Sequence, residues 1–81
     1  MEDCEVKPLS MLEIDRQARV VALEGGREFR SRLVAMGLNV GSEIRVVNNG
    51  NQAGPTLVAS GNSRLALGKG MTQKIFVIED N

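Results

Sequence analysis

The stretch RLVAMGLNVGSEIRVV, residues 32–47, decides the fold because its pattern changes there from that of a helix to that of a strand. Just upstream and within it, Phe29, Leu33 and Met36 stand at positions i, i+4 and i+7. That spacing places the three apolar side chains on one face of a helix. We therefore predict a short helix over residues 27–36 with this face turned toward the core.

Two glycines, four positions apart, then turn the chain. Gly37 follows the helix where a residue with positive φ would end it, and Leu38 is placed to pack back on the helix, as in a Schellman motif. Gly41 releases the chain into a segment in which Ile44 and Val46 alternate with polar residues, the pattern of a half-buried strand. These motif residues are predicted to be structural.

The rest of the chain alternates short β-type segments with turn signals. Gly61-Asn62 separates two such segments as a tight hairpin turn would, and a glycine corner over 68–70 precedes the last one. We predict a mainly β fold, a small bent antiparallel barrel of five strands with one end covered by the helix. The predicted strands lie over residues 18–23, 42–47, 56–60, 63–67 and 73–78.

The N-terminal residues 1–8 are predicted to be a flexible leader, so that one domain spans residues 9–79. Ser10 is a candidate cap for a short turn, with Glu13 three residues later as in a capping box. The chain has 81 residues and no apolar run near the roughly 20 that cross a bilayer. Its acidic start and single cysteine, Cys4, indicate a cytoplasmic protein in a reducing compartment.

Residues that commonly carry catalysis are missing from this sequence. There is no histidine, so the serines lack the usual base that would activate them. The glycine spacing of GLNVG lacks the Lys-Ser/Thr of a phosphate-binding loop, and the turn already explains it. We therefore predict that the protein is not an enzyme.

Two kinds of binding site stay open on the residues alone. Cys4 with its acidic neighbours Glu2, Asp3 and Glu5 is a weak candidate for a transition metal such as Fe²⁺, but no resident cofactor is expected.

The body of the chain carries an excess of positive charge, which would suit phosphates or an acidic partner. Its candidate nucleic-acid patch has little aromatic surface for base stacking, since only two aromatics are present. The cations of that patch are Arg27, Arg30, Arg32, Arg45, Arg64, Lys69 and Lys74.

Protein contact is the third possibility. Arg27, Arg30 and Val34 lie on the side of the predicted helix away from its core stripe. The polar loop 48–55 offers further candidates, namely Asn48, Asn49, Asn51 and Gln52. On the last strand, Phe76 and Ile78 face away from the core; they would either lie under residues 9–14 or form an exposed contact surface, including one between copies of the chain.

Together these motifs resemble the FeoA family, small cytoplasmic accessory proteins of bacterial ferrous iron uptake. The resemblance covers about residues 8–78, with valine at position 40 where the family usually has proline and LGKGM at 67–71 in place of an arginine-containing form. It implies an SH3-like barrel and an adaptor that binds a FeoB-type transporter, a membrane protein with a cytoplasmic GTPase domain, and modulates the GTPase cycle of that transporter. Nucleic-acid binding and direct metal binding are the alternatives. The motif is carried by Leu33, Met36, Gly37, Leu38, Gly41, Ile44 and Val46.

Overall fold

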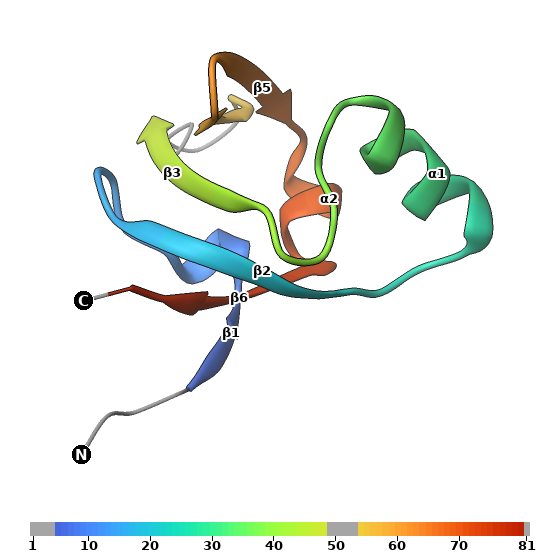
Figure 1. Ribbon diagram of the computed structural model, residues 1–81, viewed down its shortest axis with the longest axis horizontal. Helices are drawn as coiled ribbons and strands as arrows, with labels where there is room; N and C mark the ends of the chain where they lie inside the picture. The colour runs from blue at the N-terminus through green and yellow to red at the C-terminus, as the bar shows by residue number, and fades with distance from the viewer. Residues whose placement is uncertain (1–4, 49–53, 81) are drawn as a thin grey trace.

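The computed structural model describes residues 5–48 and 54–80 and contains one six-stranded antiparallel sheet (Figure 1). The strands lie side by side in the order β1-β6-β2-β3-β4-β5. This confirms the predicted mainly β, SH3-like barrel, with one strand more than the five expected. The elements are β1 (Val6–Pro8), the 3₁₀ turn η1 (Leu9–Met11), β2 (Gln17–Leu23), α1 (Arg27–Ala35), β3 (Glu43–Asn48), β4 (Thr56–Ser60), β5 (Ser63–Leu67), α2 (Lys69–Thr72) and β6 (Ile75–Glu79).

The corner between α1 and β3 has the predicted geometry. Gly37 has a φ of 92°, its amide donates to the Val34 carbonyl at 2.9 Å, and the Leu38 amide donates to the Leu33 carbonyl at 2.8 Å. These two bonds define a Schellman motif, so the helix ends at the first glycine as expected. The second glycine, Gly41, has a φ of 98°.

That second glycine also joins the corner to the sheet. The Gly41 amide donates to the Val20 carbonyl at 2.8 Å, and the Val20 amide donates to the Ser42 carbonyl at 2.9 Å. The Asn39 amide, in turn, donates to Ser42 Oγ at 3.0 Å. The corner is thus held against β2 by main-chain bonds, which fixes where α1 lies on the barrel.

Bulges and a tight hairpin curl the sheet. The register shifts between Val20 and Ala22 where β2 meets β6, and between Val46 and Asn48 where β3 meets β4. Such bulges bend a strand and increase its twist. The predicted hairpin at Gly61-Asn62 is present, with β4 and β5 paired directly across it.

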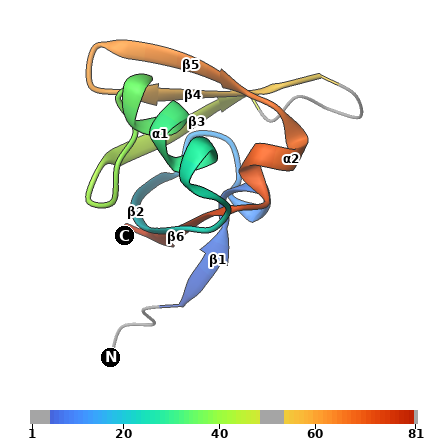
Figure 2. The same cartoon turned by 90° about the vertical axis from the view of Figure 1, so that its right-hand side faces the viewer.

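The concave side of the curled sheet holds the core. Its members are thirteen buried apolar residues, and Leu23, Phe29, Met36 and Met71 pack against them from the rim. Seen from the helical side, α1 lies in front of the curled strands (Figure 2), which agrees with the predicted cover over one end. The buried residues are Leu9, Leu12, Ala18, Val20, Leu33, Leu38, Ile44, Val46, Val58, Leu65, Leu67, Ile75 and Val77.

Two local expectations at the N-terminal side are corrected. Val6–Pro8, assigned to a leader, form β1, which pairs with β6 over residues 76–78. Ser10 is no cap, because the 3₁₀ turn follows Pro8 and has no side-chain capping bond. In the segment after β1, Leu9 and Leu12 are buried in the core. These contacts depend on pairing between the two chain ends, which local patterns do not reveal.

Two further features lie at the C-terminal side. The glycine corner at 68–70 includes the start of a one-turn helix, α2. Phe76 and Ile78 are half-buried on the outer side of β6, opposite Pro8 and Val6 of β1. The outer side of β6 is therefore flanked by a strand and is only partly open to solvent.

Candidate protein-docking surface

The outward face of α1 forms a shallow, open groove. It is lined by Arg27, Arg30, Ser31, Val34 and Ala35. Positions 27, 30, 31 and 34 follow one another at helical spacing, so that they share one side of the helix. Val34, 53 % exposed, supplies an apolar centre to this surface. We call these five residues the α1 face.

The opposite side of the helix fixes the α1 face in place. Leu33 is fully buried, and Phe29 and Met36 pack against the core, as the periodicity predicted. Lys74 at the entry to β6 holds its ammonium 5.5 Å from the centre of the Phe29 ring, within the range of a cation–π contact. Because apolar packing sets the rotation of the helix, Arg27, Arg30 and Val34 must point to solvent.

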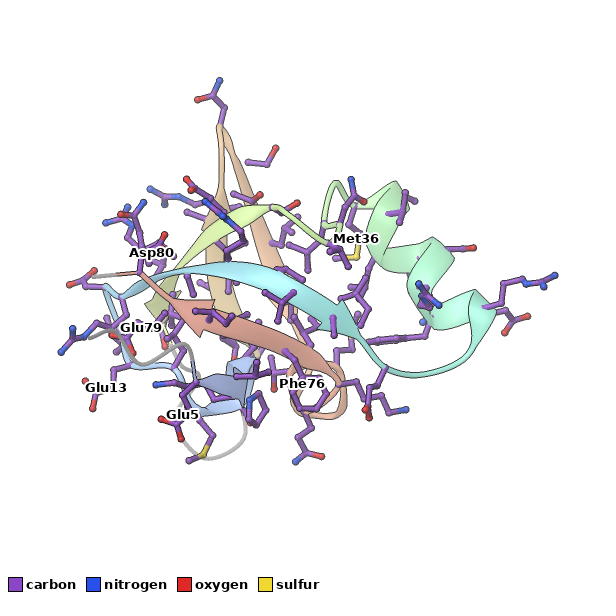
Figure 3. All side chains as sticks on the ribbon, turned by 60° about the horizontal axis from the view of Figure 1, so that its bottom comes forward. Glu5, Glu13, Met36, Phe76, Glu79 and Asp80 are labelled. Carbon is purple, nitrogen blue, oxygen red and sulfur yellow. The ribbon has the colours of Figure 1, made fainter. Side chains whose placement is uncertain are left out.

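The charges of the α1 face are unpaired among the described residues. Neither Arg27 nor Arg30 takes part in an ion pair there, and no acidic residue lines the groove. Glu5, Glu13, Glu79 and Asp80 lie on the other side of the molecule from α1 (Figure 3). The ion pairs found in residues 5–48 and 54–80 are Lys7–Glu79, Arg16–Glu13, Arg16–Glu79, Arg19–Glu43 and Arg45–Asp15, none of which includes a residue of α1.

Arg27 also occupies an unfavourable position for the helix itself. It is the first residue of α1, after Gly26, which supplies no side-chain cap. A cation at a helix N-terminus opposes the helix dipole, and a missing cap leaves amides unsatisfied. A residue that costs stability locally and gains no partner within the described structure is often found at a functional site.

An ionic cluster surrounds Glu79 on the side of the molecule away from α1 (Figure 3). Lys7 Nζ lies 3.0 Å from Glu79 Oε1, and Arg16 Nη1 lies 3.1 Å from Oε2 of the same carboxylate. The hydrogen bond from Lys7, with the charges of Lys7 and Arg16, lowers the pKa of Glu79 below its ordinary value. This cluster ties β1 and β6 to the start of β2, and we interpret it as structural.

The remaining sequence-predicted residues do not join the α1 face. Asn48 is at the end of β3, whereas α1 precedes the beginning of that strand (Figure 1). Asn49, Asn51, Gln52 and Cys4 lie outside the described residues. The prediction from sequence did not include Ser31 and Ala35. They follow Arg27 by four and eight positions, a spacing that indicates the same side of the helix.

The predicted patch of cations is divided between surfaces. Arg45, on β3, has its Nη1 3.9 Å from Asp15 Oδ1, and Lys74 contacts the Phe29 ring. Arg45 also borders a second open groove, over β2, β3 and β4, with Gln17 and Ala59. Only Arg27 and Arg30 line the groove on the helix.

The described part of the chain has neither a membrane-spanning helix nor a cluster of metal ligands. None of its helices is long and apolar enough to cross a membrane. Residues 5–48 and 54–80 also contain no group of three or more histidine, cysteine, aspartate or glutamate residues placed to hold a metal ion. The candidate at Cys4 falls outside that range.

Comparison with known families gives a clear match. The family model described as the FeoA domain matches residues 7–79. A protein of Methanocaldococcus jannaschii named "Putative Fe(2+) transport protein A" is 34% identical over 70 residues, which cover 86% of this chain and 83% of that protein.

Solved structures agree with this match. A crystal structure described as iron uptake regulatory protein (FeoA) is 34% identical, with a TM-score of 0.86, over 94% of this chain and 100% of that one. Iron(II) transport protein A from Clostridium thermocellum is 32% identical with a TM-score of 0.77, over 89% of this chain and 44% of that one. A manganese-dependent transcriptional repressor has a TM-score of 0.88 but 18% identity, over 99% of this chain and 45% of that one, and therefore shows a shared fold alone.

Proposed function

The chain belongs to the FeoA family, and on this premise we propose that it is a non-enzymatic cytoplasmic adaptor of ferrous iron uptake. It binds the cytoplasmic part of a FeoB-type transporter and modulates the GTPase cycle of that protein. The observation that carries the proposal is the match to Fe²⁺ transport protein A, which extends over most of both chains.

The surface chemistry supports an adaptor that works by contact. The α1 face is an exposed surface with an apolar centre and two unpaired arginines, both of which are favourable features of a protein interface. The described residues contain no cluster of metal ligands that would favour direct iron carriage. Protein contact is thus the function that the described residues support best.

A calorimetric titration tests this proposal. The purified chain is titrated with the cytoplasmic part of the FeoB-type transporter from the same organism, loaded with GDP or with a non-hydrolysable GTP analogue. We expect saturable one-to-one binding, with an affinity that differs between the two nucleotide states because a regulator of the cycle must discriminate between them. Absence of binding in both states would refute the adaptor.

A further inference from the structure

We propose that the α1 face docks an acidic segment of the transporter, one in which carboxylates flank an apolar side chain. This inference rests on the proposed function and specifies its contact surface and the chemistry of the partner. Val34 and Ala35 would contact the apolar side chain, while Arg27 and Arg30 would pair with the carboxylates.

The shape of the surface fits such a segment. The groove runs along one side of a nine-residue helix, with the arginines toward its N-terminal half and the apolar pair at its C-terminal half. Val34 is among the large apolar side chains left more than half exposed. Docking an apolar group there removes that surface from water, which is the main favourable contribution in most protein associations.

Charge complementarity identifies the partner as acidic. An arginine guanidinium binds a carboxylate through two parallel hydrogen bonds, and arginines are enriched at the energetic centres of interfaces. The described residues offer Arg27 and Arg30 no ion-pair partner, whereas the acids of the ion pairs found there are already paired with cations outside α1. Glu28 lies on the flank of the helix and does not line the groove.

The same surface is a poor match for nucleic acid. Single-stranded nucleic acid is bound by aromatic side chains that stack on the bases and by a basic groove that follows the backbone. The α1 face has no aromatic residue, since Phe29 is turned toward the core, and only two cations line it. An acidic protein segment with an apolar side chain would use both arginines and the apolar pair of this face.

Charge reversal with a matched control tests the inference. Arg30→Glu and Arg27→Glu are compared with Arg64→Glu, which makes the same change in net charge at an exposed arginine of β5, outside the groove. The measured quantity is the dissociation constant for the cytoplasmic part of the transporter at low and at high salt. We expect each helix variant to bind at least about tenfold more weakly at low salt, and Arg64→Glu to stay within about twofold of the wild type.

Two further variants separate the contributions. Val34→Thr keeps the shape of the side chain but replaces a methyl group with a hydroxyl, and we expect about three- to tenfold weaker binding that is independent of salt. Arg30→Ala removes the charge without adding a repulsive one, so its effect should be smaller than that of Arg30→Glu. Circular dichroism of each variant confirms that the fold is kept.

The outcomes distinguish this inference from the proposed function. If the wild-type chain binds the transporter and Arg30→Glu binds equally well, the docking surface is wrong and the adaptor stands. If the wild-type chain does not bind in any nucleotide state, the adaptor itself is wrong. If single-stranded oligothymidine binds the wild type more tightly than the transporter does, and Arg30→Glu abolishes that binding, the α1 face is a nucleic-acid site and the inference is overturned.

Discussion

Replacement of Gly37 with alanine tests the corner that positions the α1 face. Gly37 has a φ of 92°, and a Cβ built on it would meet nothing within 4 Å. The cost of alanine is therefore backbone strain without a clash, about 1–2 kcal/mol for a left-handed residue with a side chain. In a domain of this size about 1 kcal/mol corresponds to about 4–8 °C, so we expect the melting temperature to fall by about 4–16 °C.

Gly70→Ala is the matched control for this prediction. Gly70 lies in α2 outside the left-handed region, and a Cβ there also meets nothing within 4 Å. Alanine at this position should leave stability unchanged or raise it by about 0.5–1 kcal/mol. Urea denaturation of both variants gives the free energies. If Gly37→Ala has the urea midpoint of the wild type, or if Gly70→Ala loses as much stability, strain at the helix end is not what the first glycine relieves.

Three other predictions follow from the same contacts. Leu33→Ala removes a fully buried side chain and should lower the free energy of unfolding, measured by urea denaturation, by about 2–5 kcal/mol. Val34→Ala changes the neighbouring, exposed side chain and should alter this free energy by less than about 0.5 kcal/mol. Equal losses for the two variants would mean that the helix is rotated from the orientation described. Because the pKa of Glu79 is lowered in the folded state, its ion pairs contribute stability that is complete above the ordinary pKa of 4.5 and is lost as pH falls through the lowered pKa. The melting temperature should therefore fall less steeply between pH 6 and about pH 3 for Glu79→Gln than for the wild type. Parallel pH dependences would show that the ion pairs of Glu79 do not contribute to stability. Arg27→Glu places an acid at the start of α1 and should keep or raise stability by about 0.3–1 kcal/mol at low salt, even though it weakens docking; a destabilised variant would show that Arg27 has a structural partner.

Local signals in the sequence were sufficient to predict the corner between α1 and β3 and the side of α1 that faces the core. The spacing of Phe29, Leu33 and Met36 predicted which side of α1 is buried, and two glycines predicted where the chain turns. These features depend on residues within a few positions of one another, so that a single sequence reveals them. The same periodicity, applied to the other side of α1, found Arg27, Arg30 and Val34.

Features that depend on distant pairing were not predicted. β1 has three residues and is defined by its pairing with residues 76–78 of β6, at the other end of the sequence, so it was assigned to a leader. For the same reason the sequence could not show that Arg45 has an acidic partner while Arg27 and Arg30 have none among the described residues. The unpaired charge of the α1 face, on which the proposed docking depends, is a property of the folded chain.

Chemical-shift mapping is the most direct test of the central claim that the chain acts by docking α1 on its transporter. The ¹⁵N-labelled chain would be titrated with the unlabelled cytoplasmic part of the FeoB-type protein, and the amide signals followed residue by residue. We expect the perturbations to concentrate on residues 27–35 and to weaken as salt is added. Perturbations confined to other strands, or none at all at saturating partner concentration, would contradict it.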